Sequence, residues 1–190
     1  MMRWMVISDR VRVQLVRVDL GTGQTESGQD YRKINPDGYV PALVLADGDV
    51  LTEGPAIVQY LADQAAEKGL APPPGSRERY HLMQWLNFIS TELHKTYAAL
   101  FDPRVQPDCK ALFTERLTQR FAHVAAVLET QPYLMGERFT VADAYLFTVA
   151  SWAPWVKLDM APWPRLREYV SRVAARPKVQ EALVAEGLVE

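Results

Sequence analysis

The chain contains one cysteine, Cys109, among its 190 residues, so no disulfide can form within it. A protein without structural disulfides suits a reducing compartment, and we expect it to be cytoplasmic. No apolar run reaches the ~20 residues of a membrane-spanning helix, and no signal peptide is visible. Neither sign of charge is in excess, because the formal net charge is −2. This balance argues against a nucleic acid or a membrane surface as the partner.

Metal-ligating residues are also sparse. The three histidines, His81, His94 and His123, are scattered, and neither a carboxylate nor a thiol recurs beside them at the spacing of a zinc site. We therefore expect no metal site.

The chain has 48% hydrophobic residues, enough to bury the core of one large or two small domains. Leu70–Arg77, which reads LAPPPGSR, is a Pro-rich connector and the best candidate for a domain boundary. Beyond it, apolar residues at helical spacing predict helices over 78–100, 112–128, 141–155 and 166–175. Thr140 and Asp143 stand three apart ahead of the third helix, a spacing typical of a capping box.

The most informative stretch is 35–61, where a turn, a hairpin and a helix start follow one another. Residues 35–38, NPDG, have turn chemistry. The apolar run 42–45 and the pair Val50–Leu51 read as two strands joined by Asp47-Gly48, a two-residue hairpin signal. Pro41 cannot donate to a strand ladder, which leaves the backbone of Val40 available to pair with something other than protein.

A helix is expected to begin directly after this hairpin. Thr52 is placed to cap it, Glu53 and Gly54 stand at its mouth, and Pro55 suits its first turn. Free amides at a helix N-terminus attract a carboxylate, while the Glu53 side chain can accept a hydrogen bond from an ammonium group. The simpler interpretation is that Glu53 only caps its own helix. Spacing alone favours this simpler interpretation.

The pattern GYVPAL, a DG hairpin and LTEGPAIVQYLAD resembles the glutathione-binding half of the glutathione S-transferases, most closely the bacterial beta class. The resemblance runs from about Val13 to the end of the chain. It implies an α+β two-domain fold: a truncated thioredoxin-like domain over 1–68, a linker over 69–76 and an all-α helical domain over 77–190.

The same resemblance implies a glutathione site. In the family, the proline after the valine is cis, and the backbone of the valine pairs with the cysteinyl part of glutathione. An acidic residue and a small residue at the helix start hold the γ-glutamyl end. Carried onto this chain, these roles fall to Val40, Pro41, Glu53 and Gly54.

Further site residues are implied on the first long helix after the connector. The beta class uses an asparagine, a glutamate, a histidine and a lysine there, around glutathione and across a dimer. The matching residues are Asn87, Glu92, His94 and Lys95. Asn87, Thr91 and His94 or Lys95 recur at spacings of three and four, which predicts a shared helix face. His94 is the candidate to tune or position the thiol, and the alternative is a surface histidine with no task.

The start of the chain departs from the family pattern. Residues 13–20 alternate between apolar and polar and predict a strand, and 21–29 read as a polar loop. The family has a first strand, a loop with the thiol-activating residue and a helix ahead of this strand, more than twelve residues can hold. We therefore expect the chain to begin inside the first helix, beyond the thiol-activating position. Residues 3–8 are then either the tail of that helix or part of an improvised hairpin.

The implied activity is the conjugation of the glutathione thiol to a small electrophilic substrate. Glutathione is a co-substrate in this scheme, no resident cofactor is implied, and a homodimer is expected. The alternative is a non-catalytic glutathione-binding or protein-interaction module with the same fold.

Overall fold

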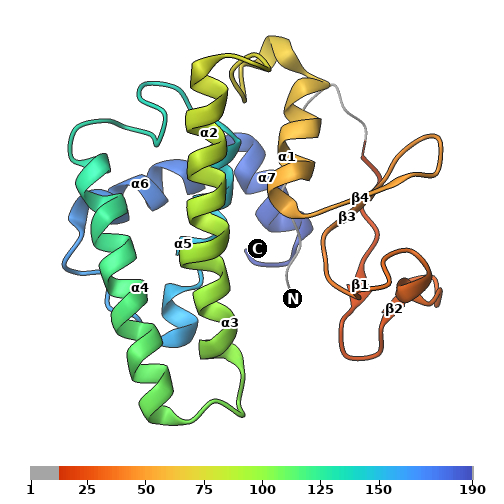
Figure 1. The fold of residues 1–190 in the computed structure, drawn as a ribbon, viewed down its shortest axis with the longest axis horizontal. Coiled ribbons are helices and arrows are strands. Elements are labelled where there is room, and N and C mark those ends of the chain that lie inside the picture. Colours follow the sequence, from red (N-terminus) through yellow and green to blue (C-terminus); the bar gives the residue numbers. More distant parts are fainter. Residues whose placement is uncertain (1–12, 190) are drawn as a thin grey trace. The chain divides into compact units, whose positions relative to one another are not determined.

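The computed structural model describes residues 13–189 (Figure 1). The two interpretations of residues 3–8 lie outside the described residues. The described residues divide into two compact units, one of residues 13–69 with 181–189 and one of residues 70–180. The strands all belong to the first unit, and the second is helical, which confirms the predicted α+β two-domain class. The domain boundaries at residues 68 and 77 stay predictions. Within the part of the chain described, no helix is both long and apolar enough to cross a membrane.

The first unit begins with a short hairpin. Strand β1 (Val18–Asp19) pairs antiparallel with β2 (Gln24–Thr25). The predicted strand over 13–20 is therefore wrong in extent. Before Val18, only Arg17 bonds across the hairpin, where its carbonyl accepts from the Glu26 amide at 2.9 Å, and residues 13–16 pair with no described strand. Leu15 and Val16 in this segment are 54% and 50% exposed. Extended chain without ladder bonds and without burial is not held as a strand.

A second hairpin follows the 3-10 helix η1 (Tyr31–Lys33). Strand β3 (Ala42–Val44) pairs antiparallel with β4 (Val50–Thr52), with Leu43 opposite Leu51. The amide of Leu45 donates to the carbonyl of Asp49 at 2.8 Å, so the connecting loop has three residues, 46–48. The two-residue loop expected from Asp47-Gly48 is wrong by one residue. Gly48 has φ +89°, and a three-residue hairpin loop needs such a left-handed residue.

Helix α1 (Gly54–Asp63) leads directly from β4, as expected. Thr52 does not cap it, because Thr52 is the last residue of β4 and Glu53 occupies the N-cap position. The helix buries one face through Ile57, Leu61 and their neighbours. A short 3-10 helix, η2 (Ala66–Lys68), follows it.

The second unit is built from helices that follow one another along the chain. They are α2 (Arg77–Phe88), the π-helix η3 (Ile89–His94), α3 (Lys95–Phe101), α4 (Pro107–Leu128), α5 (Val141–Ala150), the 3-10 helix η4 (Ala153–Val156), α6 (Pro164–Ala174) and α7 (Pro177–Ala185), whose last residues fall in the first unit. Figure 1 shows α2, η3 and α3 as one long helix with α4 alongside it. The predicted helix over 78–100 therefore forms, with a π-helical turn inside it.

The start of α5 is fixed by a fully buried carboxylate. Oδ2 of Asp143 accepts hydrogen bonds from the Thr140 amide at 2.8 Å and from its hydroxyl at 3.0 Å, which confirms the predicted capping role. Oδ1 accepts from the Leu134 amide at 2.9 Å and from the Tyr169 hydroxyl of α6 at 3.2 Å. Asp143 therefore joins a turn, α5 and α6 at one point. Burial raises its pKa, although all four donors oppose the rise.

Tyr97 of α3 is buried among aromatic rings with its hydroxyl unsatisfied. The side chain is 0% exposed, and its oxygen has no hydrogen-bond partner in the described structure. Its ring stacks on Phe101 at 5.7 Å and meets Trp152 edge-on at 5.5 Å. A buried hydroxyl without a partner loses its hydration and gains no bond in exchange.

We expect Tyr97→Phe to raise the free energy of unfolding, by roughly 1 kcal/mol, since it removes only the unsatisfied hydroxyl. Urea unfolding of the wild type and the variant measures the change. The matched control is Tyr169→Phe, which deletes a hydroxyl that donates to Asp143 and should cost about 1–3 kcal/mol. A loss of stability in Tyr97→Phe as large as in the control would contradict the assignment.

Candidate functional site

The chain enters the site through a turn. The Gly38 amide donates to the carbonyl of Asn35 at 2.9 Å, and Gly38 has φ +72°, which confirms the turn predicted over 35–38. The carbonyl of Tyr39 then accepts two hydrogen bonds, each of 2.7 Å, from the Tyr31 hydroxyl and from Nδ2 of Asn35. Both donor side chains are buried. No sequence motif predicted this pair of hydrogen bonds.

The Val40-Pro41 peptide is cis, as the family resemblance implies. Val40 is half-buried, and neither its N–H nor its carbonyl makes a hydrogen bond within the described chain. Pairing of the second hairpin starts only at Ala42, opposite Thr52. Among the described residues the backbone of Val40 therefore has no partner, because Pro41 cannot extend the ladder. Its pairing with a ligand stays a prediction.

Glu53 stands between β4 and α1 with an unusual backbone. Its φ is +65° and its ψ is +112°, a conformation that costs a non-glycine residue about 1–3 kcal/mol. Its side chain makes no capping hydrogen bond, so the interpretation that it only caps its own helix is wrong. The exposed carboxylate has no hydrogen bond or ion pair to any described residue. It lies at the N-terminus of α1, beside the buried Gly54.

This helix end offers two kinds of ligand contact. The first amides of a helix have no partner within the helix, and the end of the helix carries partial positive charge. A carboxylate can bind there, at Gly54, while the Glu53 carboxylate can accept from an ammonium group. Together with the Val40 backbone, the first unit presents groups for a peptide with a zwitterionic end.

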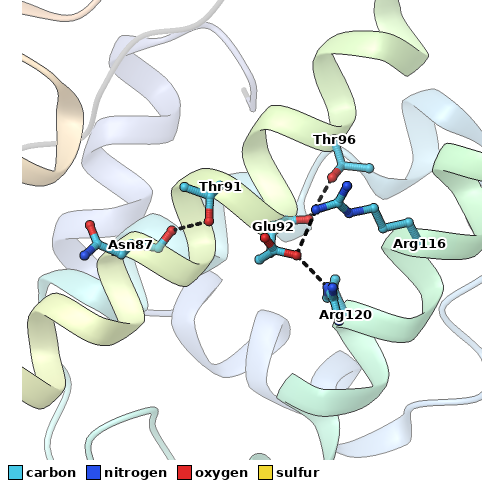
Figure 2. Close-up of polar contacts among 6 residues, drawn as sticks. All are labelled: Asn87, Thr91, Glu92, Thr96, Arg116 and Arg120. Carbon is cyan, nitrogen blue, oxygen red and sulfur yellow. Dashed lines mark hydrogen bonds and ion pairs between the residues drawn. The ribbon is translucent and has the colours of Figure 1, made fainter.

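The second set of predicted residues lies on and around the π-helix η3. Figure 2 shows the Thr91 hydroxyl donating to the Asn87 carbonyl at 3.1 Å and the Thr96 hydroxyl donating to the Glu92 carbonyl at 2.8 Å. The shared face predicted for Asn87, Thr91 and His94 assumed α-helical spacing. A π-helical turn holds more residues than an α-helical turn, so spacings of three and four do not mark one face across it. π-Turns are frequent at functional sites.

Glu92 points from η3 toward α4 (Figure 2). Its Oε2 accepts from Nε of Arg120 at 2.7 Å and from Nη2 of Arg116 at 3.1 Å. The hydrogen bond from Arg116 is the main cause that holds its pKa below the usual value. No sequence motif marks the two arginines as partners of Glu92, although their spacing of four places both on one side of α4. The predicted role of Glu92 toward glutathione stays a prediction, and in the structure its carboxylate already joins η3 to α4.

His94 ends the π-helix and is half-buried. Its Nδ1 lies 2.8 Å from the Tyr145 hydroxyl in a hydrogen bond, and its ring meets Trp152 edge-on at 4.9 Å. Burial, followed by the charge of the neighbouring Lys95, lowers its pKa. His94 is therefore not the exposed surface histidine of the alternative interpretation. No sequence pattern marks Tyr145 or Trp152 as a partner of His94, because sequence spacing does not reveal which residues of α5 and the following turn meet η3.

In the part of the chain that the structure describes, no three His, Cys, Asp or Glu side chains lie close enough together to hold a metal ion. Cys109 is exposed at the first turn of α4.

Comparison with known proteins identifies the family. Residues 2–64 match the glutathione S-transferase N-terminal domain, and residues 88–177 match the C-terminal domain of the same family. The glutathione S-transferase GstA of Escherichia coli O157:H7 is 46% identical over 92% of this chain and 87% of its own length. The chain belongs to the glutathione S-transferase family.

Solved structures of the family agree with the fold. The bacterial transferase BphK, solved as a ternary complex, is 53% identical and superposes with a TM-score of 0.92 over 93% of this chain and 88% of its own. A sphingomonad glutathione S-transferase complexed with glutathione is 42% identical, with a TM-score of 0.88 over 92% and 87%. A beta-class enzyme of Sphingomonas chungbukensis is 41% identical, with a TM-score of 0.88 over 92% and 87%. The resemblance to the bacterial beta class is thereby confirmed.

The lowered pKa of His94 makes a prediction about pH. The folded state binds a proton at His94 less readily than the unfolded state, whose histidine has the ordinary pKa of about 6.5. Stability should therefore fall as the pH drops through the window between 6.5 and the lower folded-state pKa. Urea unfolding across this range should show the fall in the wild type and a smaller one in His94→Gln.

NMR titration of the ring protons provides the direct check. In Lys95→Met, the pKa of His94 should rise toward the ordinary value yet stay below it, because burial is the larger cause. A wild-type pKa above 6.5 would contradict the description of this residue.

Proposed function

We propose that the chain binds glutathione through the Val40 backbone and the N-terminus of α1, and that it conjugates the glutathione thiol to a small electrophilic substrate. The observation that carries the proposal is the backbone of Val40, ahead of the cis proline, which pairs with no residue that the structure describes. The N–H and carbonyl of one residue can pair with an extended peptide as a neighbouring strand would. The cysteinyl residue of glutathione supplies the matching carbonyl and N–H.

The γ-glutamyl end of glutathione fits the second part of the proposed site. Its α-carboxylate would accept from the amide of Gly54 at the start of α1, and its ammonium group would donate to the Glu53 carboxylate. The backbone of Glu53 has φ +65°, and strain of this kind is typical of residues held for function. The sphingomonad relative that was solved with glutathione supports this choice of ligand.

In the proposed reaction, the glutathione thiol loses its proton to a base and the thiolate sulfur attacks an electrophilic carbon. A carbon–sulfur bond forms, and the leaving group departs with the bonding electron pair. A higher thiolate fraction speeds the attack, because free thiols are mostly protonated near pH 7. On the family resemblance alone, we propose His94 as the residue that tunes or positions the glutathione thiol. On the same basis, we propose Asn87, Glu92 and Lys95 as further glutathione contacts. A homodimer is proposed on the same basis.

A second candidate keeps the binding site without the chemistry. It is favoured by the lack of a cysteine among residues 13–69 and 181–189, the described part of the unit that contains Val40 and Glu53. A glutathione-binding or protein-interaction module would show binding without turnover.

Calorimetric titration with glutathione tests the binding site. Glu53→Gln should weaken the affinity by about tenfold or more, since it removes the charge from a hydrogen bond to an ammonium group. Asp49→Asn is the matched control: it neutralises an exposed carboxylate on the same hairpin and should leave the affinity unchanged. Equal affinities for the wild type and Glu53→Gln would place glutathione elsewhere.

Turnover is measured separately, as conjugation of glutathione to an aromatic halide. A rate well above the uncatalysed reaction supports the transferase, and binding without turnover supports the module.

A further inference from the structure

The peptide bond that joins Tyr39 to Val40 is held by two buried side chains. The Tyr31 hydroxyl and Nδ2 of Asn35 both donate to its carbonyl oxygen at 2.7 Å. Each donor residue is only 4% exposed, whereas Tyr39 itself is 75% exposed. The side chain of Tyr39 therefore does little to fix the loop, and its carbonyl is the anchored group.

The two donors are themselves held in place. Oδ1 of Asn35 accepts from the Asp37 amide at 3.3 Å, which orients the side-chain amide so that Nδ2 faces Tyr39. Tyr31 begins the short helix η1, and burial raises the pKa of its hydroxyl, so that it stays a donor at neutral pH. Neither donor needs to move to reach the Tyr39 carbonyl.

Because the Tyr39 carbonyl and the Val40 N–H belong to one planar peptide group, fixing the carbonyl also fixes the direction of the N–H. In a planar trans peptide, the carbonyl and the N–H point in opposite directions. Two hydrogen bonds use both lone pairs of the Tyr39 oxygen, and rotation of the peptide plane would break both. The direction of the Val40 N–H is therefore set by Tyr31 and Asn35, although neither residue has to touch a ligand.

We propose that Tyr31 and Asn35 are positioning residues that aim the Val40 N–H at the cysteinyl carbonyl of glutathione. The proposal rests on the proposed function, since it requires glutathione to pair with Val40. A donor fixed before binding avoids the entropy cost of ordering it on binding, and the gain appears as affinity. Two residues of the loop region thus act through one backbone amide.

Two variants and a modified ligand test the positioning role. Tyr31→Phe deletes one donor with no other change of shape, and Asn35→Ala deletes the other. Each should weaken glutathione binding by about fivefold, as expected for one lost hydrogen bond. Tyr39→Phe is the matched control, because it changes the anchored residue while leaving its carbonyl and both donors in place. Its affinity should equal that of the wild type.

The second ligand is a glutathione analogue in which the cysteinyl carbonyl is reduced to a methylene group. It cannot accept from the Val40 N–H, so Tyr31→Phe and Asn35→Ala should change its affinity by less than about twofold. Equal losses for the two ligands would mean that the variants damage the site in general, and would overturn the proposal. Unchanged glutathione affinity in both variants would overturn it as well.

Thermal unfolding shows whether each variant folds. If only one of the two variants folds, that variant alone tests the positioning role, because each variant deletes a different donor. Failure of the proposed function has a different signature. In that case the wild type itself does not bind glutathione, and the positioning role is rejected with it.

Discussion

Proline at position 41 has no N–H, and the arrangement of the first unit depends on that absence. The ladder between β3 and β4 begins at Ala42 and cannot extend back through Pro41, so Val40 lies outside this hairpin and its backbone pairs with no described residue. The Tyr39 carbonyl, one residue earlier, is taken by Tyr31 and Asn35. The chain therefore holds the peptide on one side of Val40 firmly and leaves Val40 itself for a partner. The same hairpin then delivers Glu53, in a strained conformation, to the start of α1.

In the helical unit, polar side chains join elements to one another. Asp143 accepts hydrogen bonds from a turn, from the start of α5 and from α6, and Glu92 joins the π-helix to α4 through two arginines. The contacts of Glu92 give a structural role to a residue that the family resemblance places around glutathione and across a dimer. His94 combines both aspects, since its hydrogen bond to Tyr145 and its contact with Trp152 place it in the packed interior of the unit.

The features that sequence predicts well here are local. The turn at 35–38, the cis proline, the capping role of Asp143 and the existence of the long helices all follow from residues close together in the chain or from the family pattern. The features that sequence predicts poorly depend on distant partners. Residues 13–16 have a strand pattern yet pair with no described strand, and the partners of Glu92 and His94 lie on other helices.

The π-helix shows a second limit of prediction from sequence. An apolar pattern over 78–100 predicts a helix but not a change in the number of residues per turn. The shared face inferred for Asn87 and His94 assumed α-helical spacing, which does not hold across η3. The anchoring of Tyr39 was missed because neither Tyr31 nor Asn35 belongs to a motif for it, and only burial brings both to one carbonyl.

Hydrogen exchange at the Val40 amide, followed by NMR with and without glutathione, tests whether glutathione pairs with the Val40 backbone. We expect the amide to exchange readily in the free protein, because it has no partner in the described chain. Glutathione should slow its exchange. Slower exchange at other amides on glutathione binding, with Val40 unchanged, would contradict this pairing.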